Sequence, residues 1–407
     1  MEEDRISQLP DQILEQILSL IGTNQALQTT ILSTRWKTLS HTLSDLRFHL
    51  SLFAAHRHTP LKNLKTAQAL SHRFSHFVSH LLALRDGAAT IRNFHLSFDT
   101  HLHIYADQSF IDKCIRYAVN HGVESLRLHA RCGPDFALPA AFFTSKTLRE
   151  LELRQFGRVI CALEKFSLPH LKTLFLEGSW FCHDGYYDSP LKEPFSGFPE
   201  LEKLTLRRCS VYKLVMKAPK LRFLEIVDES SYSNGMEEIS GPLLTSFRYE
   251  GKFPFHCSKI DLPMLEEVYL SIHYKRQSHN RYNNVDSKRM TLECVRMFQL
   301  LGNAKIVALT LDTFKVLEKN RGLIEESPCP FLYMKCLKVM KGRRETTTVL
   351  RRVMNYLTEG TLYFDSLVVE FPQGGMTVVE KNSEDLFEDE SDDQELELLF
   401  GTEDEIV

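Results

Sequence analysis

The feature that most constrains this chain is a short leucine pattern that returns through its middle. The pattern is L-x-x-L-x-L, in which other apolar residues can replace leucine. It fits IRNFHL from Ile91, VESLRL from Val123, LRELEL from Leu148, LKTLFL from Leu171, LEKLTL from Leu201, LRFLEI from Leu221, LTSFRY from Leu244, LEEVYL from Leu265 and IVALTL from Ile306. Most successive spacings lie between 20 and 30 residues, so a repeat architecture is predicted before any local structure.

In the last four positions of each segment, x-L-x-L, apolar residues alternate with other residues, which predicts a half-buried β-strand. One such unit cannot bury its own leucines, so neighbouring units stack into a solenoid with a parallel sheet. The segment LEKLTLRRCSV matches the longer leucine-rich-repeat pattern L-x-x-L-x-L-x-x-N/C-x-L. In this match Cys209 takes the N/C position at the polar turn, and Val211 takes the last apolar position. We therefore predict an α/β fold with irregular leucine-rich repeats over residues 91–315 and short or non-helical outer sides. Cys209 is interpreted as structural.

The strand alternation also predicts which side chains point outward, onto the open, concave face of the solenoid. Charges of both signs alternate there with aromatic residues, which protein-binding surfaces use as anchors. The candidate substrate-binding residues are Arg154, Phe175, Lys203, Arg207, Phe223, Arg248 and Tyr269. The alternative is that these residues simply face solvent.

The first forty residues carry more aliphatic side chains than a segment of that length can bury. Pro10 suits the start of a helix, and an apolar stripe runs from Ile13 to Ile21. Gly22 ends it, Thr23 or Asn24 can cap a second helix, and Ser33 or Thr34 can cap a third. Three helices of this size need a partner surface or the adjoining repeats to cover them.

The segment DRISQLPDQILEQILSLIGTNQALQTTILSTRWKTL resembles an F-box, in particular the plant form, from Asp4 to about Phe48. Joined to irregular leucine-rich repeats, the chain is similar to plant F-box/leucine-rich-repeat proteins. The resemblance implies the substrate-recognition subunit of an SCF-type ubiquitin ligase, which is not itself an enzyme. Its F-box binds a Skp-type adaptor, and through it a cullin, while the repeats bind a target protein for ubiquitination.

The resemblance also implies which residues contact the adaptor. By their match to the motif they are Leu9, Pro10, Ile13, Leu14, Ile17, Leu32, Arg35 and Trp36. One position departs from the plant pattern, because Ser40 stands where a second tryptophan is usual. The alternative for this stretch is a helical cap private to the solenoid.

The expected organisation has five parts. Residues 1–48 form the F-box, 49–90 a helical linker or cap with a helix over 61–85, and 91–315 the repeats. Residues 316–376 read as strand, helix, strand and faintly resemble the FBD-type region of such plant proteins. Residues 377–407 contain thirteen acids and one lysine, which predicts an acidic disordered tail.

Motifs for chemistry are missing from the sequence. It contains no G-x-S-x-G, P-loop or G-x-G-x-x-G motif, so we expect no catalytic residues and no cofactor. The nine cysteines form no CxxC pair, and His72, His76 and His80 lack an HExxH glutamate, so no metal site is expected.

Binding to nucleic acid or a membrane is not expected either, because the basic excess is modest and no long apolar window exists. A reduced protein of the nucleus, the cytoplasm or both fits the cysteine pattern. The basic KGRR segment is interpreted as a solvated face rather than a nuclear signal.

Two other functions stay open at this point. The first is a leucine-rich-repeat scaffold outside the ligase, with the F-box reduced to a cap. The second is a small-molecule sensor in which Arg154, Arg207 and Arg248 bind an anionic ligand, since guanidinium groups suit such ligands.

Overall fold

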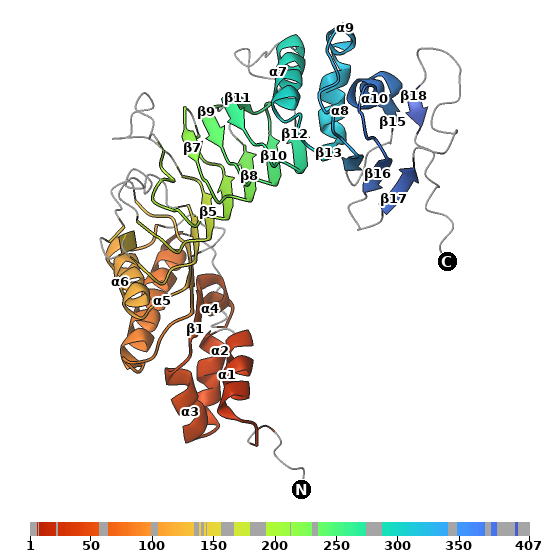
Figure 1. Cartoon of the computed structure of the whole chain (residues 1–407). Coiled ribbons are helices and arrows are strands. Elements are labelled where there is room, and N and C mark those ends of the chain that lie inside the picture. The colour runs from red at the N-terminus through yellow and green to blue at the C-terminus, as the bar shows by residue number, and fades with distance from the viewer. Residues whose placement is uncertain are drawn as a thin grey trace. The chain divides into compact units, whose positions relative to one another are not determined.

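The computed structural model describes most of the chain, and the chain divides into two compact units, Met1–Thr205 and Leu206–Val407 (Figure 1). Each unit is described by itself. The described residues are 6, 8–21, 23–56, 64–98, 105–133, 138–139, 142–143, 145–155, 167–179, 193–211, 213–229, 235–273, 287–340, 348–370, 376–380 and 395–397.

The first unit begins with a helical module. It contains α1 (Asp11–Leu20), α2 (Thr23–Gln28), the 3-10 helix η1 (Thr29–Ile31) and α3 (Thr34–His41). Pro10 precedes α1, as predicted. Ser33 is the N-cap of α3, because its side chain accepts a hydrogen bond from the Trp36 amide. The three predicted helices are confirmed, and Ser33 rather than Thr34 is the cap.

A parallel sheet follows directly on the helical module. Its strands, in spatial order, are β1 (Asp45–His49), β2 (Asn93–Ser97), β3 (Ser125–His129), β4 (Glu150–Arg154) and β5 (Thr173–Glu177). β6 (Lys203–Arg207) contains the boundary between the units. Each of β2 to β6 starts two residues into its predicted leucine pattern. β1 was not predicted, although LSDLRF from Leu43 fits the same pattern.

Helices cover one face of this sheet. They are α4 (Leu50–His56), α5 (Leu64–Leu84) and α6 (Gln108–Asn120), and the helix predicted over 61–85 is thereby confirmed (Figure 1). The inward side chains of the strands, such as Leu96 and Leu126, are fully buried. Phe74 of α5 packs against Phe98 with ring centroids 5.3 Å apart. The opposite face of the sheet carries the polar residues of the repeats.

The start of α6 offers a small, local test of the fold. The Asp107 carboxylate accepts a hydrogen bond of 2.7 Å from the Phe110 amide, which has no partner within the helix. Asp107→Ala should lower the free energy of unfolding by about 1 kcal/mol. Asp107→Asn, which can still cap the helix, should lose clearly less in a urea titration. Equal losses for both variants would show that the cap hydrogen bond is not responsible.

The described residues of the second unit form a large parallel sheet, a three-stranded sheet and a two-stranded sheet that is described below. The large sheet has the parallel strands β8 (Phe223–Asp228), β10 (Ser246–Gly251), β12 (Glu267–Ile272), β13 (Ile306–Thr310), β14 (Cys336–Met340) and β16 (Ser366–Glu370). The three-stranded sheet contains β7 (Val215–Lys217), β9 (Gly235–Ser240) and β11 (His256–Asp261) (Figure 1). Its short strands confirm the predicted non-helical outer sides for these repeats, whereas the 13-residue α6 shows that the prediction was wrong for the repeat between β2 and β3.

Later repeats of the second unit carry helices. These are α7 (Ser287–Leu300), α8 (Leu311–Glu318), α9 (Arg321–Glu325) and α10 (Arg351–Thr358). β14, α10 and β16 form the predicted strand, helix and strand, and they continue the parallel sheet beyond the predicted limit at residue 315.

The ninth leucine pattern was placed two residues too late. In the structure it begins at Ala304, not Ile306, because Ala304, Val307 and Leu309 are the fully buried residues. The Ala304 amide donates to the Leu301 carbonyl at 3.1 Å, just as Leu265 donates to Leu262 at 3.2 Å. Small alanine at the first position hid the true register from a search for large apolar residues.

Part of the tail predicted to be disordered forms strands. β17 (Met376–Glu380) pairs antiparallel with β16, and β18 (Glu395–Glu397) pairs antiparallel with β15 (Thr348–Leu350). The prediction therefore does not hold for these two segments. The rest of the tail and the KGRR segment lie outside the described residues.

Candidate functional site

The helical module exposes a set of large aliphatic side chains, which we call the aliphatic patch. It consists of Ile6, Ile13, Ile17, Leu20, Ile31 and Leu32. Ile31 is 87% exposed, Leu20 79% and Leu32 64%, which is unusual for residues of this size. Ile13, Ile17 and Leu20 follow at helical spacing on α1, so they share one outward face.

Other apolar residues of the module form its interior. Leu14 and Leu18 of α1 are buried, and Trp36 of α3 is only 7% exposed. Arg35 ties the two helices together, because its Nε donates to Asp11 Oδ1 at 2.8 Å and its Nη2 donates to the Leu9 carbonyl at 2.6 Å. These contacts hold the module in shape and leave the aliphatic patch without a covering layer among the described residues.

The predicted adaptor-binding residues therefore fall into two groups. Pro10, Ile13, Ile17 and Leu32 are exposed, and Leu9 is half-buried. Leu14 and Trp36 are buried in the module and the half-exposed Arg35 links the start of α1 to α3, so in this structure these three position the surface rather than form it. Adaptor contact by the exposed residues stays a prediction.

The sequence reading missed three members of the patch, Ile6, Leu20 and Ile31. A signal exists for Leu20 alone, because α1 has apolar residues on more than the single stripe that a packed helix needs. Ser40, the departure from the plant pattern, is 2% exposed and donates to the Lys37 carbonyl at 2.7 Å. It lies inside the module and is not part of the exposed patch.

On the open face of the first unit, three histidines from neighbouring strands lie in contact. The rings of His49 on β1 and His95 on β2 have centroids 4.4 Å apart, and those of His95 and His129 on β3 are 4.7 Å apart. His129 Nε2 lies 2.8 Å from Glu152 Oε1 on β4. The sequence reading predicted β2 and β3 but not β1, and it missed this set of histidines because it listed outward residues only from Glu150 onward.

Glu152 is the centre of an ion-pair network. Arg154 Nε donates to Glu152 Oε1 at 2.6 Å, and the Arg154 guanidinium lies over the Phe175 ring, 4.8 Å from its centroid. Burial by itself raises the pKa of Glu152, but the hydrogen bonds from His129 and Arg154 outweigh it and lower that pKa to about 2. Glu152 is therefore ionised at neutral pH and holds its neighbours in place.

The surroundings of His95 favour its neutral form, whereas those of Glu152 favour the charged form. Burial disfavours the charged imidazolium, and the neighbouring His129, His49 and Arg127 add to the effect, so the pKa of His95 is lowered to about 3. Its ring is neutral at neutral pH.

This shift predicts a pH dependence of stability. As the pH falls through about 6.5, His95 takes up a proton in the unfolded chain but not in the folded one, so stability decreases. His95→Gln removes this term, so the melting temperature of wild type should fall more steeply than that of the variant between about pH 7 and pH 5. Parallel melting curves over this window would contradict a neutral His95. Glu152 titrates below it and does not interfere.

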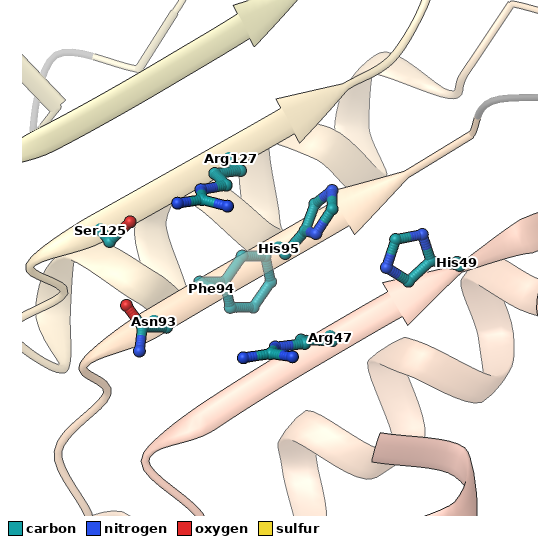
Figure 2. Close-up of a pocket in the computed structure, with 7 residues that line it drawn as sticks. All are labelled: Arg47, His49, Asn93, Phe94, His95, Ser125 and Arg127. Atoms are coloured by element: carbon teal, nitrogen blue, oxygen red, sulfur yellow. The ribbon is translucent and has the colours of Figure 1, made fainter. Parts of the chain in front are cut away.

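A pocket of about 320 Å³ lies on the open face of β1, β2 and β3, and we call it the β1–β3 pocket (Figure 2). Its lining residues are Arg47, His49, Asn93, Phe94, His95, Ser125 and Arg127. Strand register places Arg47, His95 and Arg127 in one row across the three strands. In Figure 2 the two guanidinium groups lie on either side of β2 and point toward the end where Asn93 and Ser125 lie.

The open face of the second unit is a mixture of charges and aromatic rings. Glu225 lies between Arg207, at 3.7 Å, and Arg248, at 3.8 Å. The Arg248 guanidinium lies over the Tyr269 ring, 4.4 Å from its centroid. Each of these arginines therefore has an acidic partner.

A second cluster in this unit surrounds His273. Its Nε2 lies 3.1 Å from Glu250 Oε1 and its Nδ1 lies 3.3 Å from Asp312 Oδ2. The hydrogen bond with Glu250, together with Asp312, raises the pKa of His273 above its usual value despite partial burial.

All seven predicted substrate-binding residues lie on strands of the open faces. Arg154, Phe175 and Lys203 belong to the first unit, and Arg207, Phe223, Arg248 and Tyr269 to the second. Arg154, Arg207 and Arg248 already pair with carboxylates, so they are partly engaged. Target contact by any of the seven is not tested by these positions and stays a prediction.

Burial tests two further sequence predictions, those for the α5 histidines and for Cys209. His72, His76 and His80 are exposed on α5, as a polar helix face requires. Cys209 is buried, as a structural residue should be. In the described part of the chain, no group of three potential ligands is placed to hold a metal ion. Among the described helices, none has the length and apolarity needed to cross a membrane.

A helical module with an exposed aliphatic patch, followed by a parallel repeat sheet with a polar open face, defines a protein of the leucine-rich-repeat class. Comparison with known proteins agrees with this class. Residues 6–48 match the F-box domain family, so the helical module together with most of β1 is an F-box domain.

The chain is also similar to F-box/LRR-repeat proteins of Arabidopsis thaliana. One is 26% identical over 341 residues, covering 82% of this chain and 66% of the relative. Another is 27% identical over 323 residues, covering 77% of this chain and 80% of the relative. A third, an F-box/FBD/LRR-repeat protein, is 26% identical over 77% of this chain and 64% of its own length. The resemblance to plant F-box/leucine-rich-repeat proteins is confirmed, and this chain spans about two thirds of several such relatives.

Proposed function

We propose that this protein is the substrate-recognition subunit of an SCF-type ubiquitin ligase. Its F-box binds a Skp-type adaptor, which links it to a cullin, and its open sheet faces bind a target protein. The observation that carries the proposal is the aliphatic patch, because six large aliphatic side chains lie on the outer surface of a module that matches the F-box family.

The physical argument is that such a patch is costly to leave in water. Burial of apolar surface contributes roughly 25 cal/mol per Å², and contiguous exposed apolar surface marks interaction sites. Arg35, Leu14 and Trp36 keep the helices rigid, so the patch is presented to a partner without rearrangement.

In this proposal other subunits of the ligase transfer ubiquitin, and this chain only binds the adaptor and the target. Mixed charges and outward rings on the open faces, such as Arg154 over Phe175 and Arg248 over Tyr269, suit a protein target. We place the protein in the nucleus or cytoplasm as part of the same proposal.

The direct test is assembly with the adaptor. The full chain is co-expressed with a Skp-type adaptor, and the complex is analysed by size exclusion with light scattering. A stable one-to-one complex is expected. A chain that stays monomeric and monodisperse when mixed with excess adaptor would favour the scaffold reading and overturn the proposal.

A ligand sensor is not favoured by the arginines that first suggested it. Arg154 pairs with Glu152, and Arg207 and Arg248 both pair with Glu225. A small anion would have to displace these carboxylates, so the receptor proposal does not invoke a ligand at these three arginines.

A further inference from the structure

The β1–β3 pocket lies on the first unit, apart from the residues predicted to bind a target. Its middle row runs Arg47, His95, Arg127, and its first row runs Asp45, Asn93, Ser125. Phe94 lies beneath the pocket in the core, so the floor is held by a fully buried ring. β1 belongs both to this sheet and to the F-box match at residues 6–48.

The two arginines of the pocket have unused hydrogen-bond donors. The guanidinium of Arg47 makes no hydrogen bond or ion pair with any residue that the structure describes, and the Arg47 side chain is exposed. Arg127 lies 3.5 Å from Glu150 and 3.7 Å from Glu152, which is longer than a charge-assisted hydrogen bond. Each guanidinium carries five N–H donors in a planar fork that fits a carboxylate.

The carboxylates around the pocket are occupied by other donors. Asp45 accepts from Asn93 Nδ2 at 2.6 Å, and Glu150 accepts from Ser125 Oγ at 2.9 Å. Glu152 is held by His129 and Arg154. None of these three carboxylates pairs with Arg47, so its guanidinium remains available on the pocket side.

Between the two arginines, the His95 ring is partly buried and contacts the rings of His49 and His129. A neutral ring there separates two cations without adding a third charge. The pocket thus places the guanidinium of Arg47, unpaired among the described residues, and that of Arg127, which its two glutamates engage only at 3.5 and 3.7 Å, on either side of a neutral ring.

We propose that the β1–β3 pocket binds a carboxylate side chain from an acidic segment of the target protein, with Arg47 as the anchoring residue and Arg127 as its partner across β2. This inference rests on the proposed function and names the chemistry of the target. The acid enters between the two guanidinium groups and forms charge-assisted hydrogen bonds with both.

The shape of the pocket favours an acid carried by a protein over a free small molecule. All seven lining residues come from three adjacent strands of one sheet, so the described lining lies on one side of the pocket. Small-molecule sites bury roughly 70–90% of their ligand, which a one-sided hollow cannot do. A protein segment lying along the sheet supplies the missing cover itself.

The test measures binding of a fluorescein-labelled peptide of alternating Glu and Ser to the full chain in complex with its adaptor, by fluorescence polarisation. A peptide of alternating Gln and Ser serves as the uncharged probe, and succinate serves as the free dicarboxylate. The variants are Arg47→Gln and Arg127→Gln. Arg73→Gln is the matched control, because Arg73 is exposed on α5 of the same unit and its loss changes the net charge equally.

The acidic peptide should bind, and Arg47→Gln should weaken it about tenfold, whereas Arg73→Gln should change it less than about twofold. Binding that is equal for the Glu and Gln peptides, or unchanged in both Arg47→Gln and Arg127→Gln, overturns the proposal. Succinate binding as tightly as the peptide with the same dependence on Arg47 also overturns it, in favour of a free-anion site.

The same preparations separate this inference from the proposed function. Arg47→Gln should co-purify with the Skp-type adaptor as wild type does, because Arg47 is not in the aliphatic patch. If wild type fails to bind the adaptor, the proposed function falls, and the peptide assay on the chain alone still decides whether the pocket takes a carboxylate.

Discussion

Replacing both Ile17 and Leu20 by aspartate is expected to abolish binding of the Skp-type adaptor. The two side chains are 38% and 79% exposed on α1, so the substitutions leave the packing of Leu14 and Leu18 intact. In the complex each aspartate would be an unpaired charge in an apolar interface, and hot-spot losses of this kind reach at least about 2 kcal/mol each. Adaptor affinity, measured by calorimetry, should fall at least about 100-fold.

The matched control is Leu52→Asp, because Leu52 is 58% exposed on α4 and lies outside the F-box match at residues 6–48. This variant should bind the adaptor within about twofold of wild type. Both variants should keep the wild-type circular dichroism spectrum. If the Ile17/Leu20 double variant binds as tightly as wild type, the aliphatic patch is not the adaptor interface.

Phe74→Ala is expected to be among the most destabilising single substitutions in the first unit. Phe74 is fully buried on α5, and its ring lies 5.4 Å from that of Phe53 and 5.3 Å from that of Phe98. Truncation leaves a cavity where α4, α5 and the end of β2 meet. The expected loss is about 3–5 kcal/mol of unfolding free energy, measured by urea titration with hydrogen exchange to localise it.

Two comparisons isolate the cavity as the cause. Phe74→Leu keeps much of the buried volume and should lose clearly less than the alanine variant. Leu84→Ala changes a residue that is 55% exposed on the same helix and should lie within about 0.5 kcal/mol of wild type. A loss at Leu84 equal to that at Phe74 would show that a core cavity is not the cause, and helix propensity could not explain it because alanine is the better helix former at both positions.

The repeat sheet was largely predictable because its signal is local and periodic. Residues at every second position of a strand share a face, so the buried leucines and the outward columns follow directly from the letters. The prediction failed where the first apolar residue of a repeat was small, and where a repeat lay within the segment already assigned to the helical module. Ala304 shifted the ninth repeat, and β1 was overlooked because its leucines had been assigned to the helical module.

The F-box was recognised from its motif, but the motif does not separate surface from interior. Ile13 and Leu14 are neighbours in the sequence and equally apolar, yet one is 40% exposed and the other fully buried. The rotation of α1 about its axis is decided by packing on α2 and α3, and by Arg35 holding the start of α1. Neither contact can be read from spacing alone.

Repeat architecture, the three helices of the F-box and the positions of most repeat strands were determined by the sequence by itself, because periodicity and motif order act over a few residues. The tertiary structure alone decided which aliphatic residues form the exposed patch. It also decided that Arg47, His95 and Arg127, which come from three separate repeats, line one pocket. The physical reason is that strand register and helix rotation depend on contacts between distant segments, and only those contacts place side chains on a common surface.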